Sequence, residues 1–196
     1  MRVLAVNAGS SSVKLRLLNA ADEIEARADL PAAAGGFDSA AVVAAVAGWP
    51  PPDIVAHRVV HGGTEFSRAV VVDEDVRKRL YELTALAPLH QPKSLVGLDA
   101  VTAALPDVPA IACFDTAFHT TIGAAASTYA VPARWRRRYG VRRYGFHGLS
   151  HAYASGRAIE LTHIAVAGSR VVTCHLGAGA SLCAVADGRS VDTTMG

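Results

Sequence analysis

Cysteine is scarce in this chain. Cys113, Cys174 and Cys183 are its three cysteines. Their spacing contains no CxxC pair and no Cys/His pattern of a metal site, and an odd count argues against a disulfide framework. We therefore expect these thiols to be reduced and mostly buried.

Long apolar runs and a strong net charge are also lacking. No run approaches the ~20 apolar residues that a membrane span needs, and polar residues follow Val6 too soon for the apolar core of a signal peptide. The formal net charge of +2 gives no overall attraction to nucleic acid or to an anionic membrane. These features predict a cytoplasmic protein with neither nucleic acid nor membrane as its partner.

What the chain does contain is typical of an α/β protein. Its 196 residues, 51% of them hydrophobic, suffice for one large domain or two small ones. Branched apolar residues with a partial period of two predict strands over 1–6 and 13–18. We expect further strands over 23–30, from Asp53, from Pro109 to Asp115 and on both sides of a Gly/Ser turn after Ser169. We expect helices over 39–47 and from a cap at Ser150 to about Leu161. Another helix should follow a cap at Asp73, with one face formed by Val76, Leu80, Leu83 and Ala87. A fourth should follow a cap at Ser94, with inward side chains at Leu95, Leu98, Val101 and Leu105.

The stretch VNAGSSSVK, from Val6 to Lys14, joins the first two predicted strands. Asn, Gly and Ser are ordinary turn residues, so the stretch is at least a hairpin turn. It also has the composition of an anion cradle, because backbone N–H groups and hydroxyls donate while Lys14 supplies charge. The segment from Val171 to Asp187 repeats the order of strand, small-residue turn and strand, which suggests two lobes with one cradle each, although this order is common.

Several polar residues near predicted strand ends are candidates for function. Arg58 and His61 flank two valines in HRVVHGG, where alternation places His57, Val59 and His61 on one face and Arg58 and Val60 on the other. Arg58 suits either a ligand or a structural carboxylate. Asp115 closes an apolar strand, although it could also cap the residues that follow.

Two basic patterns have competing interpretations. His147 and His151 stand four residues apart in YGFHGLSH, but no HExxH glutamate accompanies them and Gly148 weakens a helix through His147, which disfavours zinc. The arginine-rich segment 133–145 contains aromatic residues and could bind nucleic acid. The near-zero net charge of the whole chain instead favours a solvent-exposed face whose arginines form ion pairs with acidic neighbours or bind an anionic substrate.

Seven segments of the chain resemble motifs of the acetate kinase family and occur in the family's order. They are NAGSSSVK, HRVVHGG, APLHQP, ACFDTAFH, YGFHGLSH, CHLGAGAS and DTTMG. That family belongs to the two-lobed kinases related to actin, sugar kinases and Hsp70, with a ribonuclease H-like lobe. The resemblance implies an N-terminal lobe over 1–120 and the start of a second, incomplete lobe over 121–196. It also implies transfer of the γ-phosphoryl group of ATP to acetate, giving acetyl phosphate and ADP, with Mg²⁺ (or Mn²⁺), in a homodimer.

The resemblance assigns roles to individual residues. Arg58 would hold the acetate carboxylate, with His90 also in the substrate site, and His147 would stabilise charge on the transferring phosphoryl group. Asp115 matches an aspartate often described as a catalytic acid or base, but acetate is already ionised and needs no base, so we expect it to organise the metal. The small apolar wall around the methyl group would comprise Val60, Leu89 and Phe146. Asn7 would support the metal, and phosphate would contact Ser10, Ser12 and Lys14 and the loop of His175, Leu176, Gly177, Ala178 and Gly179.

The chain departs from the family pattern at several positions. Gln91 and Ala178 stand where asparagine is usual, and Leu149 where threonine is usual. The sequence stops at Gly196, roughly half-way through the pattern, before its second arginine, its adenosine-binding segment and its late glutamate. The alternatives are therefore a propionate or butyrate kinase, or an inactive remnant that binds anions or associates with itself.

Overall fold

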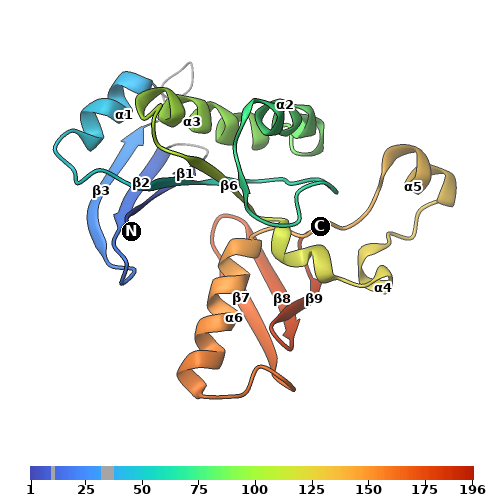
Figure 1. Ribbon diagram of the computed structural model, residues 1–196. Helices are drawn as coiled ribbons and strands as arrows, with labels where there is room; N and C mark the ends of the chain where they lie inside the picture. The colour runs from blue at the N-terminus through green and yellow to red at the C-terminus, as the bar shows by residue number, and fades with distance from the viewer. Residues whose placement is uncertain (10–11, 32–37) are drawn as a thin grey trace. The chain divides into compact units, whose positions relative to one another are not determined.

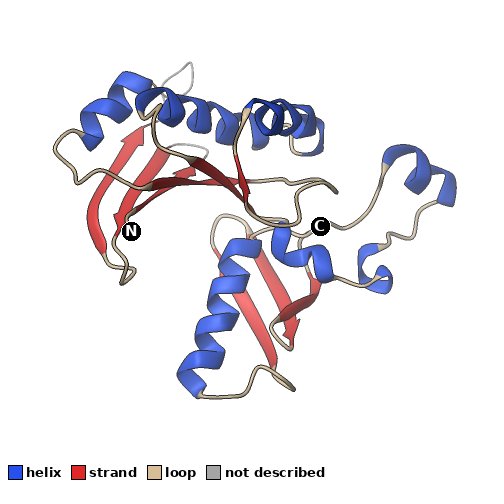
Figure 2. Cartoon of the chain, in the orientation of Figure 1, coloured by secondary structure: helices blue, strands red, loops and turns tan. Residues whose placement is uncertain are grey.

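The chain forms two compact units in a computed structural model that describes residues 1–9, 12–31 and 38–196. Unit 1 comprises Met1–Gly62 and Ala69–Cys113, and unit 2 comprises Gly63–Arg68 and Phe114–Gly196. Both contain helices and strands, which confirms the α/β prediction (Figure 2). The division into lobes over 1–120 and 121–196 stays a prediction.

A mixed six-stranded sheet of order β3-β2-β1-β4-β6-β5 forms the centre of unit 1 (Figure 1). Strand β1 pairs with β2 in antiparallel and with β4 in parallel orientation. The predicted hairpin and the strands predicted around it are thereby confirmed. The strands are β1 (Val3–Ala8), β2 (Ser12–Leu18), β3 (Ile24–Pro31), β4 (Ile54–Val59), β5 (Val70–Val71) and β6 (Ala110–Phe114).

One face of this sheet is covered by helices α1 (Ser39–Val46) and α3 (Gln91–Ala104), which also contact each other (Figure 1). Alternate residues of β1 and β2 point into this layer and are buried, because successive side chains of a strand point to opposite faces. The buried cluster contains Leu4, Val6, Ala8, Val13, Leu15, Leu17, Val42, Val55 and Val101. The other face carries the polar residues of the same strands.

Two helix starts agree with the sequence and one does not. Asp73 caps α2 (Glu74–Glu82) as predicted, although this helix gives way to the 3-10 helix η1 (Leu83–Leu86) before it reaches Ala87. The predicted cap at Ser94 is wrong. Helix α3 begins at Gln91, because Pro92 is favourable in the first turn of a helix, and Ser94 is buried inside it.

Unit 2 contains a three-stranded antiparallel sheet in the order β7-β8-β9. Helix α6 (Gly148–Thr162) packs on β7, and the 3-10 helix η2 (Ala117–Thr121) packs on β9. The predicted cap at Ser150 is wrong, because α6 begins two residues earlier. The remaining elements are β7 (Arg170–Leu176), β8 (Ala180–Ala186), β9 (Arg189–Thr193), α4 (Ala124–Ser127) and α5 (Ala133–Tyr139). Within the described ranges, no helix combines the length and apolar character that crossing a membrane requires.

Removal of the Asp73 cap should destabilise unit 1. The carboxylate of Asp73 accepts a hydrogen bond of 2.7 Å from the backbone N–H of Val76. We expect Asp73→Ala to lower the free energy of unfolding by about 1 kcal/mol. Asp73→Asn keeps the acceptor and should lie close to wild type. Urea unfolding followed by Trp49 fluorescence in a Trp135→Phe background reports on unit 1, and equal losses in both variants would contradict the capping role.

Acid should destabilise unit 1 through His57, which lies on β4 and is 2% exposed. Burial lowers its pKa from 6.5 to about 4, and its Nε2 has no hydrogen-bond partner among the described residues. The unfolded chain therefore binds a proton that the folded unit excludes. Stability is complete above the unfolded pKa and is lost as the pH falls from there towards about 4.

At about pH 5, protonation of His57 in the unfolded chain should lower the free energy of unfolding by about 2 kcal/mol relative to neutral pH. We expect His57→Leu to remove that part of the pH dependence in the same unfolding assay. His90→Gln, which removes an exposed histidine of the same unit, is the matched control. An unchanged acid sensitivity in His57→Leu would contradict this assignment.

Candidate functional site

Three of the predicted site residues meet on the face of the unit 1 sheet that the helices leave uncovered. Asn7 of β1 is paired in register with Lys14 of β2, and both side chains are exposed. The Nη1 of Arg58, on β4, donates a 3.2 Å hydrogen bond to Oδ1 of Asn7. The pleat brings them to one side because the alternate residues face the core. A guanidinium, an amide and an ammonium group together offer hydrogen-bond donors to an anion.

The segment after Arg58 leaves the strand at once. Strand β4 ends at Val59, so the predicted alternation holds for His57, Arg58 and Val59 but not beyond. Val60 and His61 are both buried, 7% and 1% exposed. Burial lowers the pKa of His61 to about 4, which keeps this imidazole neutral at pH 7.

Gln91 holds this segment through its side-chain amide. Its Oε1 accepts a 3.0 Å hydrogen bond from the N–H of His61, and its Nε2 donates to the carbonyl oxygen of His61 at 3.1 Å. The same Nε2 lies 3.4 Å from the carbonyl oxygen of Leu80. Gln91 is completely buried. The N–H and C=O of His61 lie beyond the end of β4. The side chain of Gln91 therefore supplies hydrogen bonds of the kind that a neighbouring strand provides to residues within the sheet.

The other predicted substrate residues of unit 1 are open to solvent. Leu89 is 76% exposed and His90, at the start of α3, is exposed as well. Within unit 1, only Val60 of the predicted methyl wall is buried. Of the predicted phosphate residues, Ser12 is half-buried at the start of β2, whereas Ser10 lies outside the described residues.

In unit 2, two glycines of YGFHGLSH bring backbone segments into close contact. A Cβ on Gly148 would collide with the carbonyl oxygen of Asp115, to which the N–H of Gly148 donates at 2.8 Å. Asp115 is 2% exposed and follows β6 directly. Gly145, at φ +80°, faces the ring of His119, and a Cβ there would lie 2.5 Å from Cγ of that ring. Both contacts require glycine.

His147 stands at the junction of these contacts and has the left-handed backbone conformation, with φ 58° and ψ 20°. A residue other than glycine seldom adopts this conformation unless its surroundings hold it there. Its ring stacks on that of His175, with 3.9 Å between centroids, and its Nδ1 lies 2.9 Å from Oγ of Ser181. Nδ1 of His175 lies 2.9 Å from Oγ of Ser150, the residue predicted as a helix cap.

The predicted second phosphate loop adjoins this stack. His175 and Leu176 end β7, and residues 177–179 form the turn to β8. A Cβ on Gly179 would lie 3.7 Å from Cε1 of His147, so the turn passes the outer edge of that ring. Leu176 and the turn residues are exposed. Ala178 has no polar side chain, which leaves backbone N–H groups as the donors of this loop.

Phe146 and His119 are linked by a hydrogen bond. Nε2 of His119 lies 3.0 Å from the carbonyl oxygen of Phe146 and must carry the proton, since a carbonyl only accepts. Nδ1 of His119 consequently accepts from the hydroxyl of Ser190 at 2.8 Å. The ring is fully buried, and burial lowers its pKa. This arrangement fixes the backbone that carries Phe146, whose side chain is half-buried.

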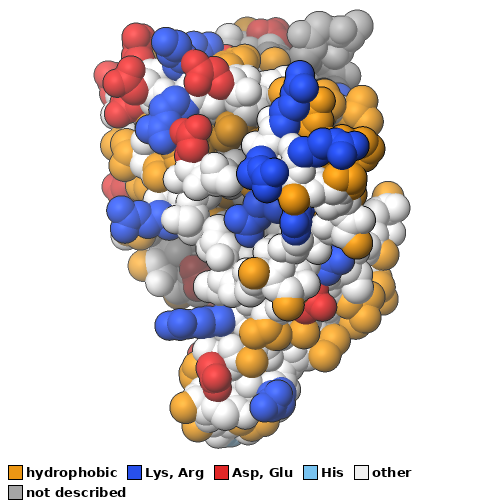
Figure 3. Space-filling model, turned by 90° about the vertical axis from the view of Figure 1, so that its right-hand side faces the viewer, with side chains coloured by type: hydrophobic (Ala, Val, Ile, Leu, Met, Phe, Trp, Pro, Cys, Tyr) orange, Lys and Arg blue, Asp and Glu red, His pale blue; other side chains and the backbone are white. Residues whose placement is uncertain are grey.

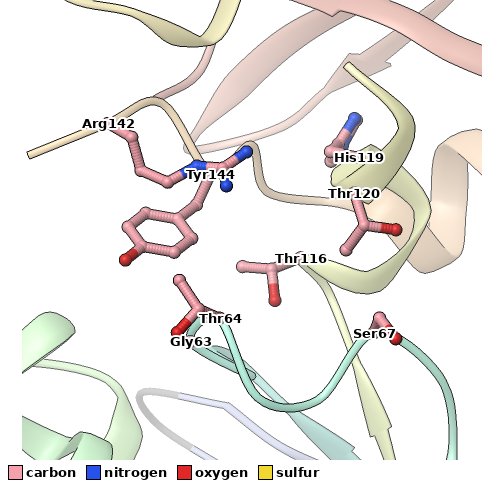
Figure 4. Close-up of a pocket in the computed structure, with 8 residues that line it drawn as sticks. All are labelled: Gly63, Thr64, Ser67, Thr116, His119, Thr120, Arg142 and Tyr144. Atoms are coloured by element: carbon pink, nitrogen blue, oxygen red, sulfur yellow. The ribbon is translucent and has the colours of Figure 1, made fainter. Parts of the chain in front are cut away.

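A separate polar cavity of about 200 Å³ lies within unit 2 (Figure 4). No residue that we predicted for substrate, nucleotide or metal lines it. The guanidinium of Arg142 lies 5.3 Å from the ring centroid of Tyr144 at its wall. The lining residues are Gly63, Thr64, Ser67, Thr116, His119, Thr120, Arg142 and Tyr144.

The arginine-rich segment is partly engaged in contacts of its own. Nη1 of Arg143 forms an ion pair of 2.8 Å with Asp192 and also donates to the carbonyl oxygen of Thr193. Arg134, Arg137 and Arg138 of α5 are exposed, and Lys and Arg side chains are visible on the face drawn in Figure 3. The ion pair agrees with the interpretation in which arginines of this segment form ion pairs with acidic neighbours.

The described residues contain no group of three or more His, Cys, Asp and Glu side chains arranged for a metal ion. Magnesium, however, often takes only one or two protein carboxylates and completes its shell with water and phosphate oxygens. Asp115 offers such a carboxylate. The Oδ1 of Asn7 already accepts from Arg58, and this positive neighbour favours an anion at that position.

Sequence reasoning missed the hydroxyl groups that hold the histidines. Ser181 and Ser190 are both completely buried, on β8 and β9, and each contacts an imidazole. Strand alternation places Ser181 beside the apolar core positions of β8, so a buried serine could have been predicted there. The histidine that each serine contacts could not, because it comes from a distant segment.

Comparison with known proteins places these residues in a family. The Acetokinase family model matches residues 52–196. The acetate kinase of Deinococcus radiodurans is 43% identical over the whole chain, which corresponds to 56% of that protein. The acetate kinase of Nostoc punctiforme is 51% identical over 74% of this chain and 35% of its own length. The chain thus spans little more than half the length of the curated relatives that it matches from end to end.

Solved structures agree with this result. The crystal structure of Porphyromonas gingivalis acetate kinase matches the whole chain with a TM-score of 0.87 at 32% identity, over 57% of that chain. A propionate kinase from Francisella tularensis matches with a TM-score of 0.86, also at 32% identity over 57% of that chain. The predicted fold is therefore confirmed as that of these kinases.

Loss of the Gln91 amide should destabilise unit 1 strongly. Gln91→Leu removes the side-chain amide that hydrogen-bonds the buried N–H and C=O of His61, and the loss costs about 1–3 kcal/mol for each group. We expect a loss of about 2–4 kcal/mol in urea unfolding followed by Trp49 fluorescence. Ser94→Ala, in the same helix, removes a buried hydroxyl that has no hydrogen-bond partner in the described part of the chain and should be nearly neutral. Comparable losses in both variants would contradict the proposed importance of the amide.

Proposed function

Because the chain belongs to the acetokinase family, we propose that the protein transfers the γ-phosphoryl group of ATP to acetate, giving acetyl phosphate and ADP. The contact of Arg58 with Asn7 on the open face of the unit 1 sheet carries this proposal. Both side chains lie at the carboxyl ends of adjacent parallel strands. Asn7 orients the guanidinium of Arg58 through this bond, and a planar guanidinium binds a carboxylate with two parallel hydrogen bonds.

The acid needs little chemical activation. Acetate is ionised at neutral pH, so its oxygen attacks phosphorus without a general base, and positioning and charge neutralisation are the main tasks. Val60, Leu89 and Phe146 would enclose the methyl group, and His90 would line the substrate site. His147 would stabilise charge on the transferring phosphoryl group. Its strained backbone and the two contacts of its ring support a held position.

The nucleotide phosphates would bind to donors from both predicted cradles. Ser10, Ser12 and Lys14 would contribute from the first hairpin. Backbone N–H groups of the loop from His175 through Leu176, Gly177 and Ala178 to Gly179 would contribute from the second. Each cradle is the turn of an antiparallel hairpin, which supports the repeated arrangement inferred from the sequence.

We assign the metal of the reaction to Mg²⁺ or Mn²⁺, with Asp115 as its carboxylate. Such a hard cation, when bound with the nucleotide, neutralises phosphate charge. Asn7 stays a predicted supporting residue for it, alongside its role as the hydrogen-bond acceptor of Arg58. We further propose a cytoplasmic homodimer that acts on a small carboxylate and a nucleotide, without nucleic acid or membrane as partner, and light scattering of the purified chain tests the dimer.

A propionate kinase is the second candidate, since a solved propionate kinase matches the chain as well as an acetate kinase does. An added methylene changes discrimination by only about 1–3 kcal/mol. Trapping of the acyl phosphate as its hydroxamate, with ATP, Mg²⁺ and acetate, propionate or butyrate, tests both candidates. A higher kcat/KM for acetate supports the first, a higher value for propionate the second, and no product from any acid contradicts both. Asp115→Ala should abolish the signal.

Substitution of Arg58 should weaken carboxylate binding. We expect Arg58→Lys to raise the KM for acetate about 10- to 100-fold, because a paired hydrogen bond to a charged group contributes about 1.5–3 kcal/mol. Arg27→Ala removes an exposed arginine from β3 and should leave the KM unchanged. An unaltered KM in Arg58→Lys would contradict carboxylate binding by this residue.

A further inference from the structure

Three side chains of unit 2 connect His147 to the protein interior through consecutive hydrogen bonds. Oγ of Ser181 lies 2.9 Å from Nδ1 of His147 and 2.8 Å from Nε2 of His151. Nδ1 of His151 lies 2.7 Å from Oγ1 of Thr173. Ser181, His151 and Thr173 are all buried, at 0%, 1% and 7% exposure. We call these three residues and His147 the histidine relay.

We infer that the histidine relay fixes the tautomer of His147, so that its Nε2 carries the proton and its Nδ1 does not. Ser181, His151 and Thr173 are then positioning residues for His147. Such a chain of four groups has only two consistent directions of donation, because each serine, threonine or neutral histidine in it has one proton to donate along the chain.

His151 is held in its neutral form. Burial, together with the neighbouring histidines, lowers its pKa to about 4, so that at neutral pH the ring has a single N–H. If Nδ1 is protonated, His151 donates to Thr173 and accepts from Ser181. If Nε2 is protonated, it accepts from Thr173 and donates to Ser181.

Thr173 decides between these directions. Its hydroxyl contacts only His151 among the described residues. If His151 donated to it, the buried hydroxyl proton of Thr173 would have no acceptor in the described part of the chain, and an orphaned buried donor costs about 1–3 kcal/mol. Thr173 therefore donates to His151. His151 in turn donates to Ser181, and Ser181 donates to Nδ1 of His147.

The consequence appears at the other edge of the His147 ring. With Nδ1 accepting, a neutral ring carries its proton on Nε2. A Cβ on Gly179 would lie 3.9 Å from this nitrogen, so Nε2 is on the side of the second phosphate loop. The relay thus presents an N–H donor there without requiring a charged imidazole. This role of the donor towards a phosphoryl group rests on the proposed function, whereas the tautomer itself does not.

The test is long-range ¹H–¹⁵N NMR of the histidine rings in the intact chain at about pH 8, where an ordinary imidazole is neutral. Spectra of His147→Gln and His151→Gln assign the two rings. We expect nitrogen shifts of the Nε2–H tautomer for both His147 and His151 in wild type. The Nδ1–H tautomer at either residue would overturn the inference, and the tautomers themselves are read from the spectrum of the wild-type chain.

Ser181→Ala tests the connection. We expect it to move the Nδ1 resonance of His147 downfield, through loss of an accepted hydrogen bond, and to mix its two tautomers. Ser181→Thr retains a hydroxyl and should restore the wild-type pattern. Ser190→Ala is the matched control, because it removes an equally buried serine hydroxyl from His119, outside the relay, and should leave His147 unchanged.

An unchanged His147 spectrum in folded Ser181→Ala would overturn the relay. A shift of the same size in Ser190→Ala would also overturn it, since a general effect of removing buried hydroxyls would then explain the result. The hydroxamate assay is independent of these spectra. A correct tautomer with no acyl phosphate therefore contradicts the proposed function alone, and acyl phosphate with the wrong tautomer contradicts the relay alone.

Discussion

The pairing of β1 on both sides is the constraint on which unit 1 depends. Its antiparallel register with β2 sets Asn7 opposite Lys14, and its parallel register with β4 brings Asn7 to Arg58. A slip of one residue in either pairing would turn the polar side chains towards the helices and the buried leucines towards solvent. The burial of alternate residues under α1 and α3 therefore stabilises the fold and aligns the candidate anion-binding groups at the same time.

Unit 2 depends on polar contacts in its interior to a greater degree. Each buried imidazole, at His119 and His151, has a hydroxyl or carbonyl partner at both ring nitrogens. Such a network is favourable only when every group is satisfied, because a buried donor or acceptor without a partner costs more than the bond contributes. The network explains why serine and threonine occupy buried positions in β7, β8 and β9, and why His147 can be held in a left-handed conformation.

Most elements of the fold follow from local patterns. The period of two predicted β1, β2 and β4, and a side-chain cap predicted the start of α2. The caps at Ser94 and Ser150 failed for different reasons: a proline starts α3 earlier, and a contact between Gly148 and Asp115 starts α6 earlier. A serine can cap a helix or bond to a distant side chain, and Ser150, which contacts His175, illustrates the second use.

The sequence by itself determined the α/β class, the strand faces and the family, because these depend on periodicity and on the order of short motifs. It also singled out Asp115 as a residue that packing does not explain, and the family resemblance singled out Arg58 and His147. Only the tertiary structure decided which groups hold them: Asn7 for Arg58, the backbone of Gly148 for Asp115, and Ser181 for His147. The physical reason is that hydrogen bonds between distant segments depend on directions and distances of a few ångströms, which residue type and spacing along the chain do not encode.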